Sequence, residues 1–417
     1  MPRFNPVYIL LLATLILFVS KSLYNIPIGI MAVAGLFLLL KAPILTWQNP
    51  TIRIFIILFL CLWVPLLISL IDAVNLDHSS KSVISYLRFL FMGIYVIHAV
   101  GKPKVLSKLN ILIFCIVGFW CVDGLIQYLF KTNLFGYPYT HGYVTGLFYP
   151  NLTIGHITAA LSPLYFDSIR VHSNKHRWLW IMLIPLFAVI LLSGRRAAWI
   201  MLAVSNIGYL FYYLKLHNYD VRLLKKVCLF GGIVFVSLGL IIASNQPLQK
   251  RLQTTANIFS GDYELADIAT ARRLPLWETS LNIFRNNWIN GVGPRGFRYV
   301  YQQYSDADNY WYTSGQTHPH QLILEVLAET GTIGFSGLLL FSLFFYRYIK
   351  AQDLGMPLFP WLLAIVVVIF PLNTHMAFYG SYWSSMFWWL MAITFAAARI
   401  QLTENKKSIQ IEKVDSR

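Results

Sequence analysis

Charge is scarce in this sequence. Only 12% of its 417 residues are Asp, Glu, Lys or Arg, whereas 57% are hydrophobic. A soluble globular domain carries roughly 25% charged residues, so the chain has about half of the charge that a water-facing surface of this length requires. This deficit excludes a soluble fold and indicates a polytopic membrane protein.

The chain also has few cysteines and no nucleotide-binding phosphate loop. Its four cysteines lie inside apolar runs, where we expect small buried hydrophobes rather than disulfide partners or metal ligands: Cys61, Cys115, Cys121 and Cys228. No GxxxxGK[ST] pattern occurs, which argues against ATP-driven work. The GVGPRG run at 291–296 resembles a dinucleotide fingerprint only superficially, because no βαβ pattern surrounds it.

Apolar runs long enough to cross a bilayer recur along the whole chain. A transmembrane helix needs roughly 20 apolar residues. We therefore predict an all-α fold with about twelve transmembrane helices, near 6–20, 24–40, 53–71, 82–100, 109–130, 152–169, 177–193, 197–214, 224–244, 320–346, 357–372 and 379–399. Residues 1–399 are expected to form a single transmembrane domain, followed by a polar cytoplasmic tail at 400–417.

The distribution of Lys and Arg predicts the orientation of these helices. Cytoplasmic loops carry an excess of basic residues, and the segments on the side of the N-terminus are the richer ones here. Both termini are therefore expected in the cytoplasm. The same bias accounts for the formal net charge of +16, so we expect no nucleic-acid partner.

A long outer segment, 245–319, separates the ninth and tenth predicted helices. It is rich in arginine, although positive charge is disfavoured on that side, and structureless loops of this length are uncommon and usually functional. Trp277, Leu281, Phe284 and Trp288 recur with helical spacing. We therefore predict a partly helical loop that packs these residues on the bundle or in the membrane interface.

His320 opens the tenth predicted helix. Pro319 suits a first helical position and Thr317 an N-cap, which predicts His320 in the first turn. A helix N-terminus favours a neutral imidazole and attracts phosphate. His320 is thus either a general base beside a phosphorylated substrate or an interfacial histidine with no chemical task.

Two arginine pairs stand at exposed ends of apolar segments. Arg195 and Arg196 form the turn between the seventh and eighth predicted helices, and Arg272 and Arg273 precede the amphipathic stretch of the long loop. Such pairs are costly beside hydrocarbon unless an anion neutralises them, and guanidinium groups bind phosphate oxygens in a bidentate fork. The alternative is anchoring to lipid headgroups.

Arg88 lies inside the fourth predicted span and is a functional candidate because intramembrane charges are expensive. Asp123, in the fifth span, is a conceivable partner for it. Tyr143 belongs to a group of outer-loop aromatic residues, which either stack on sugar rings or form the interfacial aromatic belt.

Two patterns suggest metal ligands without supporting a site. His318 and His320 could hold a metal ion, but spacing supplies no third ligand. Asp306-Ala307-Asp308 is a DxD triplet of the kind used by metal-dependent glycosyltransferases, and such triplets are common by chance. We therefore expect no metal and no cofactor.

Several of these motifs together resemble the O-antigen ligase and polymerase family. His320-Gln321, nine residues, then Gly331 to Gly334 is similar to the family's H[NSQ]x9GxxG signature. Arg196 occupies the arginine position of its SRGAW turn, with Arg195 where a small polar residue is usual. The run Arg273 to Trp277 resembles the opening of its long outer helix, followed by GVGPRGF. The segment 142–151 looks like its outer loop, although Tyr143 stands where arginine is frequent.

This resemblance implies a glycosyltransferase of the membrane-embedded GT-C type in a bacterial inner membrane. The family transfers a glycan from undecaprenyl diphosphate at the periplasmic face, without metal or ATP, because the diphosphate is the leaving group. An O-antigen ligase uses lipid A–core as acceptor and completes lipopolysaccharide, whereas a polymerase uses another carrier-linked repeat. We expect this protein to be the ligase. Its expected partners are the carrier-linked donor, lipid A–core and the membrane lipids, and the oligomeric state is open.

The resemblance also implies roles for individual residues. His320 is expected to take the acceptor proton or orient the hydroxyl in an inverting displacement. Arg196 and Arg273 are expected to neutralise charge on the diphosphate. Further contacts to diphosphate or glycan are expected from Arg88, Arg195, Arg272, His318, Gln321 and Tyr143.

A secondary transporter or flippase is the alternative from another class. Transporters often show matched halves and broken helices. The predicted architecture is lopsided instead, with one large outer segment, which disfavours transport.

Overall fold

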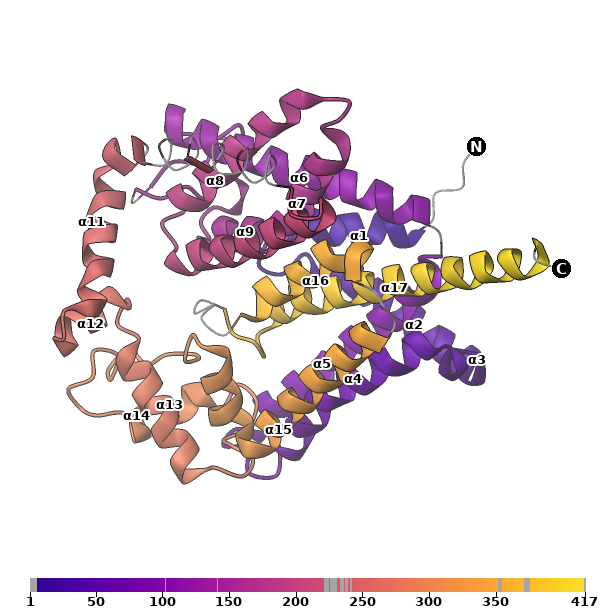
Figure 1. Cartoon of the computed structure of the whole chain (residues 1–417). Coiled ribbons are helices and arrows are strands. Elements are labelled where there is room, and N and C mark those ends of the chain that lie inside the picture. Colours follow the sequence, from indigo (N-terminus) through magenta and orange to yellow (C-terminus); the bar gives the residue numbers. More distant parts are fainter. Residues whose placement is uncertain are drawn as a thin grey trace. The chain divides into compact units, whose positions relative to one another are not determined.

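The computed structural model describes residues 6–101, 103–140, 142–220, 242–351, 355–370 and 376–415, together with 225, 231–232, 236 and 239–240 (Figure 1). These residues form helices joined by turns, and no β-strand occurs among them. The prediction of an all-α polytopic membrane protein is therefore confirmed.

Among the described residues, six helices are long and apolar enough to cross a membrane. They are α4 (Pro50–Ile68), α5 (Leu76–Ala99), α6 (Pro103–Phe130), α9 (Arg196–Leu216), α15 (Leu322–Ala351) and α17 (Ser381–Asp415), the last through its portion Ser381–Glu404. Shorter apolar helices are α1 (Pro6–Leu17), α2 (Asn25–Lys41), η2 with α8 (Arg177–Met182 and Leu183–Leu192) and α16 (Gly355–Ile369). Every predicted span overlaps a described helix, except that the ninth, 224–244, falls mostly outside the described residues.

The chain divides into two compact units. The first comprises Met1–Leu109, Pro275–Leu358 and Thr374–Arg417, and the second comprises Asn110–Leu274 and Phe359–Asn373. The long loop predicted at 245–319 is thus shared between them, with the division at Leu274. A single transmembrane domain over 1–399 stays a prediction.

In the first unit, helices pack closely where glycine replaces a side chain. Helix α2 lies against α5, and α15 lies against α4 (Figure 1). A Cβ added at Gly35 would lie 1.8 Å from the carbonyl oxygen of Phe91, and one at Gly337 would lie 2.2 Å from that of Cys61. Small residues let membrane helices approach until their backbones touch.

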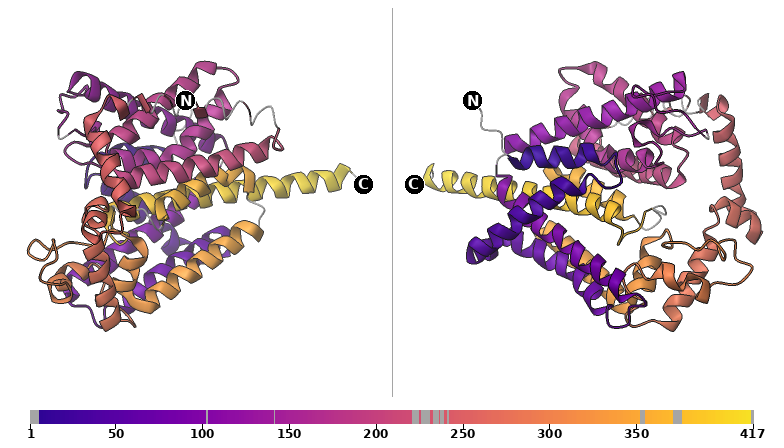
Figure 2. Two further views of the ribbon diagram at one scale, coloured as in Figure 1. Left: turned by 60° about the vertical axis from the view of Figure 1, so that its left-hand side comes forward. Right: turned by 180° about the vertical axis from the view of Figure 1, so that it is seen from behind.

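Aromatic rings fill the centre of this unit. Trp388 of α17 is fully buried and makes edge or tilted contacts with Phe55, Phe59 and Phe387. Its indole Nε1 donates to the hydroxyl of Tyr86 at 3.0 Å, so its polar atom is satisfied inside the apolar core. Helix α17 continues as one helix through 400–415, and its end extends beyond α4 and α5 (Figure 2).

The second unit is built around α7 (Ile154–His172). Almost all of its residues are buried, and it packs mainly on α9. The Ser162 hydroxyl lies 2.6 Å from that of Ser205 across this contact. Asp167 accepts from Arg170 at 2.8 Å and from the Tyr209 hydroxyl at 3.1 Å. These contacts let a helix with charged residues remain buried, because its polar groups are paired.

The long loop is largely helical. It contains α11 (Gln246–Ala256), η3 (Asn257–Phe259), α12 (Tyr263–Ala269), α13 (Leu274–Asn286) and α14 (Phe297–Tyr304). The predicted amphipathic helix is α13, but the predicted apolar face is only partly right. Leu276 and Ile283 are buried against Phe297 and Tyr301, whereas Leu281 and Trp288 are exposed. The buried residues and the exposed residues both recur with helical spacing, and packing against α14 determines which of them are buried.

Candidate active site

A tight turn between α8 and α9 brings two arginines to a helix N-terminus. Gly194 has φ +64, and a Cβ there would lie 2.3 Å from the ring of Tyr143, so both conformation and space require glycine. Arg195 is the extended N-cap residue and Arg196 begins α9. Cations are unfavourable at the positive end of a helix dipole, which makes this end a ready site for an anion.

Four arginines of the second unit form one cluster, which we call the arginine cluster: Arg195, Arg196, Arg251 and Arg273. The guanidinium carbons of Arg195 and Arg251 lie 5.9 and 5.0 Å from the centre of the Tyr143 ring. Burial, followed by the charges of Arg196, Arg195 and Arg251, lowers the pKa of Arg273 to about 10. Burial also lowers the pKa of Arg195, with Arg251 as the next cause.

Helix α9 and the long loop are joined through Arg196. Its Nη1 donates to the carbonyl of Ala269 at the end of α12 and to the Thr255 hydroxyl of α11 at 3.3 Å. These neutral acceptors leave its positive charge uncompensated. Among the described residues, no salt bridge is formed by Arg195, Arg196 or Arg251. Half-buried like charges that lie this close repel one another, and a bound anion would relieve the repulsion.

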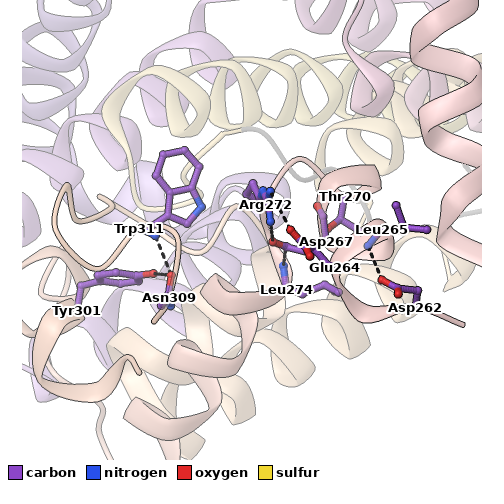
Figure 3. A network of polar contacts seen from close by, with 10 residues as sticks. All are labelled: Asp262, Glu264, Leu265, Asp267, Thr270, Arg272, Leu274, Tyr301, Asn309 and Trp311. Carbon is purple, nitrogen blue, oxygen red and sulfur yellow. Dashed lines mark hydrogen bonds and ion pairs between the residues drawn. The ribbon is translucent and has the colours of Figure 1, made fainter. Parts of the chain in front are cut away.

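Arg272 has a different role from its neighbour Arg273. Its guanidinium lies 3.2 Å from Asp267 and 3.9 Å from Glu264 (Figure 3). Asp267 is buried and also accepts from the backbone N–H of Leu274 at 3.2 Å. The substrate contact of Arg272 stays a prediction. Its carboxylate partners show that it shapes the turn between α12 and α13.

A pocket of about 540 Å³ opens beside the arginine cluster. Its walls come from the segment after α6, the start of α9, α11 and the end of α12, through Tyr143, Arg196, Gln246, Pro247, Lys250, Arg251, Thr254, Ile268 and Ala271. Cationic groups stand beside the apolar side chains of Pro247, Ile268 and Ala271. The pocket therefore suits a ligand with an anionic head and an apolar continuation.

His320 belongs to the first unit and lies just before α15. The helix begins at Leu322, so the prediction of His320 within the first turn is wrong. Gln321 acts as the cap, because its Oε1 accepts from the N–H of Leu324 at 2.5 Å. His320 has φ 57, and its ring centre lies 4.0 Å from that of His318. A left-handed backbone at a non-glycine residue is strained, and such strain clusters at functional sites.

The glycine signature after His320 has a clear structural basis. Gly331 has φ 61 and ψ −157 inside α15, and a Cβ there would lie 2.3 Å from the carbonyl oxygen of Ile289. The helix kinks at this point, and the N–H groups of Thr332 and Ile333 donate to the carbonyls of Trp288 and Ile289 at 2.8 and 3.1 Å. The signature thus marks where the segment that follows α13 in the long loop docks on α15.

Two buried carboxylates on α15 escaped the sequence reasoning. Glu325 accepts from the N–H groups of Phe378 and Tyr379 at 2.8 and 3.0 Å. Glu329 accepts from the N–H of Arg295 at 2.7 Å, and the Arg295 guanidinium lies 4.0 Å from Glu325. Two acids four residues apart in an apolar span were the available signal. They hold the segments around 295 and 378 against α15.

Arg88 of α5 is placed by contacts inside the first unit. Its guanidinium donates to the Ser381 hydroxyl at 2.7 Å and lies 4.6 Å from the centre of the Phe89 ring. Asp123, suggested as its partner, accepts instead from Asn133 and the N–H of Leu134 at 3.0 and 3.1 Å.

The DxD triplet forms part of an exposed turn. Asn309 orders this turn by accepting from the Tyr301 hydroxyl at 3.0 Å and the N–H of Trp311 at 2.9 Å (Figure 3). Asp306 and Asp308 are exposed. In the part of the chain that the structure describes, no three His, Cys, Asp or Glu side chains gather as metal ligands.

The fold and these clusters define a multi-pass helical membrane protein with a half-buried cationic site. The family model described as O-Antigen ligase matches residues 181–341, a segment that includes Arg196, Arg273 and His320. Over this segment the chain is similar to the O-antigen ligase family, which confirms the resemblance inferred from the sequence. The match supports a function of the O-antigen ligase or polymerase type. A search of curated proteins finds no match to this chain.

Proposed function

We propose that this protein is an O-antigen ligase, which transfers O-antigen from undecaprenyl diphosphate to a sugar hydroxyl of lipid A–core. The observation that carries this proposal is the arginine cluster beside an amphipathic pocket. Guanidinium groups are suited to a diphosphate because they bind its oxygens bidentately. The apolar wall of the pocket suits the start of a polyprenyl chain.

In the proposed reaction, an acceptor hydroxyl attacks the anomeric carbon while the bond from that carbon to the diphosphate oxygen breaks. His320 removes the hydroxyl proton, which is general-base catalysis. Arg196 and Arg273 stabilise the negative charge that develops on the leaving diphosphate. One displacement inverts the anomeric configuration, and the chemistry needs neither ATP nor a metal ion.

The proposal includes a location and an orientation. We place the protein in a bacterial inner membrane, with both termini in the cytoplasm and the long loop in the periplasm. Support comes from the distribution of basic residues and from the chemistry, since the carrier diphosphate supplies the driving force where ATP is absent. The partners are the carrier-linked donor, lipid A–core and the surrounding lipids.

The test is a transfer assay with purified protein, carrier-linked O-antigen and lipid A–core, with chelator present and ATP omitted. Wild type is compared with His320→Ala and with His176→Ala, an exposed histidine outside the candidate site. Glycan on lipid A–core with wild type and His176→Ala, but not with His320→Ala, is the expected result. Longer carrier-linked chains with unmodified core would make the protein a polymerase, and no transfer by folded protein would reject both.

A further inference from the structure

Helix α11 contributes a cation that no sequence motif suggested. Arg251 is half-buried on this helix, and its guanidinium stacks over the ring of Tyr143 at 5.0 Å from the ring centre. Its Nη1 also donates to the Tyr143 hydroxyl. The ring of Tyr143 therefore fixes the plane of the guanidinium, and its hydroxyl accepts from one of the guanidinium nitrogens. The other N–H donors of the guanidinium point away from Tyr143.

The surroundings of Arg251 are cationic rather than acidic. Its charge contributes to lowering the pKa of Arg195 and of Arg273, so the groups repel one another. In the described ranges of the chain, the buried Nε atoms of Arg251 and Arg195 have no hydrogen-bond acceptor. Arg272, by contrast, is matched by Asp267. An isolated buried donor is costly, and a bound anion would remove both the repulsion and the unmet hydrogen bonding.

The pocket gives such an anion a place. Arg196, Lys250, Arg251 and Tyr143 line one part of its wall, and Pro247 and Ile268 line another. Arg196 comes from α9 and Arg251 from α11, so two helices present guanidinium groups to the same space of about 540 Å³. Two separate arginines match a ligand with two phosphates better than a ligand with one.

We propose that Arg251 is a further diphosphate-binding residue and that Tyr143 positions it. This inference rests on the proposed function, because it assigns one more contact to the same leaving group. Arg251 binds one phosphate of the diphosphate, and Arg196 binds the other. Tyr143, which was expected to contact substrate itself, acts through Arg251.

The experiment measures binding of farnesyl diphosphate and farnesyl monophosphate to the purified full-length protein in detergent. Arg251→Ala is compared with Arg285→Ala, a control that removes the same charge from an exposed site on α13. A charge-assisted hydrogen bond contributes enough that its loss weakens binding by roughly ten-fold or more. We expect that loss of affinity for the diphosphate in Arg251→Ala, a smaller loss for the monophosphate, and less than a two-fold change in Arg285→Ala.

Two conservative variants separate binding from folding. Arg251→Lys retains the charge without the fork and is expected to recover part of the affinity. Tyr143→Phe retains the ring and removes the acceptor of Arg251, and a loss of about two- to five-fold is expected because the guanidinium loses one restraint. If Arg251→Ala does not fold, these two variants decide the question by the ratio of diphosphate to monophosphate affinity.

Several results would overturn the proposal. Equal affinities in Arg251→Ala and Arg285→Ala would show that Arg251 does not touch the ligand. Equal displacement of the probe by phosphatidylglycerol vesicles would identify a site for lipid headgroups instead. Because the assay contains neither glycan nor acceptor, a protein that binds the diphosphate through Arg251 but transfers nothing to lipid A–core would refute only the proposed function.

Discussion

Replacing Gly331 with alanine is expected to destabilise the protein through the kink of α15. The residue has φ 61 and ψ −157, a conformation that side chains other than hydrogen rarely adopt. An added Cβ would also lie 2.3 Å from the carbonyl oxygen and 2.4 Å from the carbonyl carbon of Ile289. Both atoms belong to backbone, so no side-chain rotation can relieve the contact.

The expected loss of stability is the sum of two costs, the backbone strain and the steric overlap of the added Cβ. Backbone strain of this kind costs about 1–3 kcal/mol, and overpacking costs about 1–3 kcal/mol. The sum is about 2–6 kcal/mol, because the two terms arise from different atoms and add. At about 2 °C or more for each kcal/mol, the melting temperature should fall by about 4 °C or more.

The assay is thermal unfolding of the detergent-solubilised protein, followed by tryptophan fluorescence. Gly29→Ala is the matched control, because Gly29 lies within α2 with no atom within 4 Å of an added Cβ. That substitution should be neutral or stabilise by up to about 1 kcal/mol through helix propensity. A Gly331→Ala protein that melts with wild type and Gly29→Ala would refute the reasoning, since the kink would then tolerate a side chain.

Four further predictions concern charge and the turns around the site. Glu329→Leu should lower stability by about 1–3 kcal/mol in thermal unfolding, because the N–H of Arg295 loses its acceptor, whereas Glu329→Gln should cost less. The affinity for farnesyl diphosphate should fall as pH rises through about 10, where Arg273 loses its proton in the folded protein; a fall of equal size in Arg273→Gln would contradict this. The pKa of Arg273 is lower in the folded protein than in the unfolded chain, so its charged form opposes folding at every pH below about 10. As the pH rises above about 10 this opposition weakens, and stability against urea should rise. Gly194→Ala should reduce transfer about ten-fold or more, measured as kcat/KM, because the added methyl displaces the Tyr143 ring; unchanged kcat/KM would contradict it.

Much of this protein can be predicted from local sequence. Length and hydropathy of a run decide whether it can cross a bilayer, so most of the apolar helices were predictable in place, whereas the short α3 had no predicted counterpart and α17 continues to Asp415, past its predicted end at 399. The resemblance to the family also depends on short motifs, such as the run from His320 to Gly334. These features lie within a few turns of chain, where the spacing of residues is directly visible.

The tertiary structure decided the features that join distant segments. In sequence, the local surroundings of Arg251 and Arg273 are similar to those of Arg272. Packing alone brings Arg251 and Arg273 into the arginine cluster, whereas Arg272 forms an ion pair with Asp267. The N-terminus of α15 was misplaced because Gln321 supplies the cap rather than Thr317.

The same limit applies to burial. The apolar face of α13 and the acceptor role of Glu329 depend on residues far along the chain, Phe297 and Arg295 among them. Periodicity and composition are properties of neighbouring residues, so they determine the helices and the membrane class. Which side chains meet is determined by helix packing, because contacts between distant segments leave no regular spacing in the sequence.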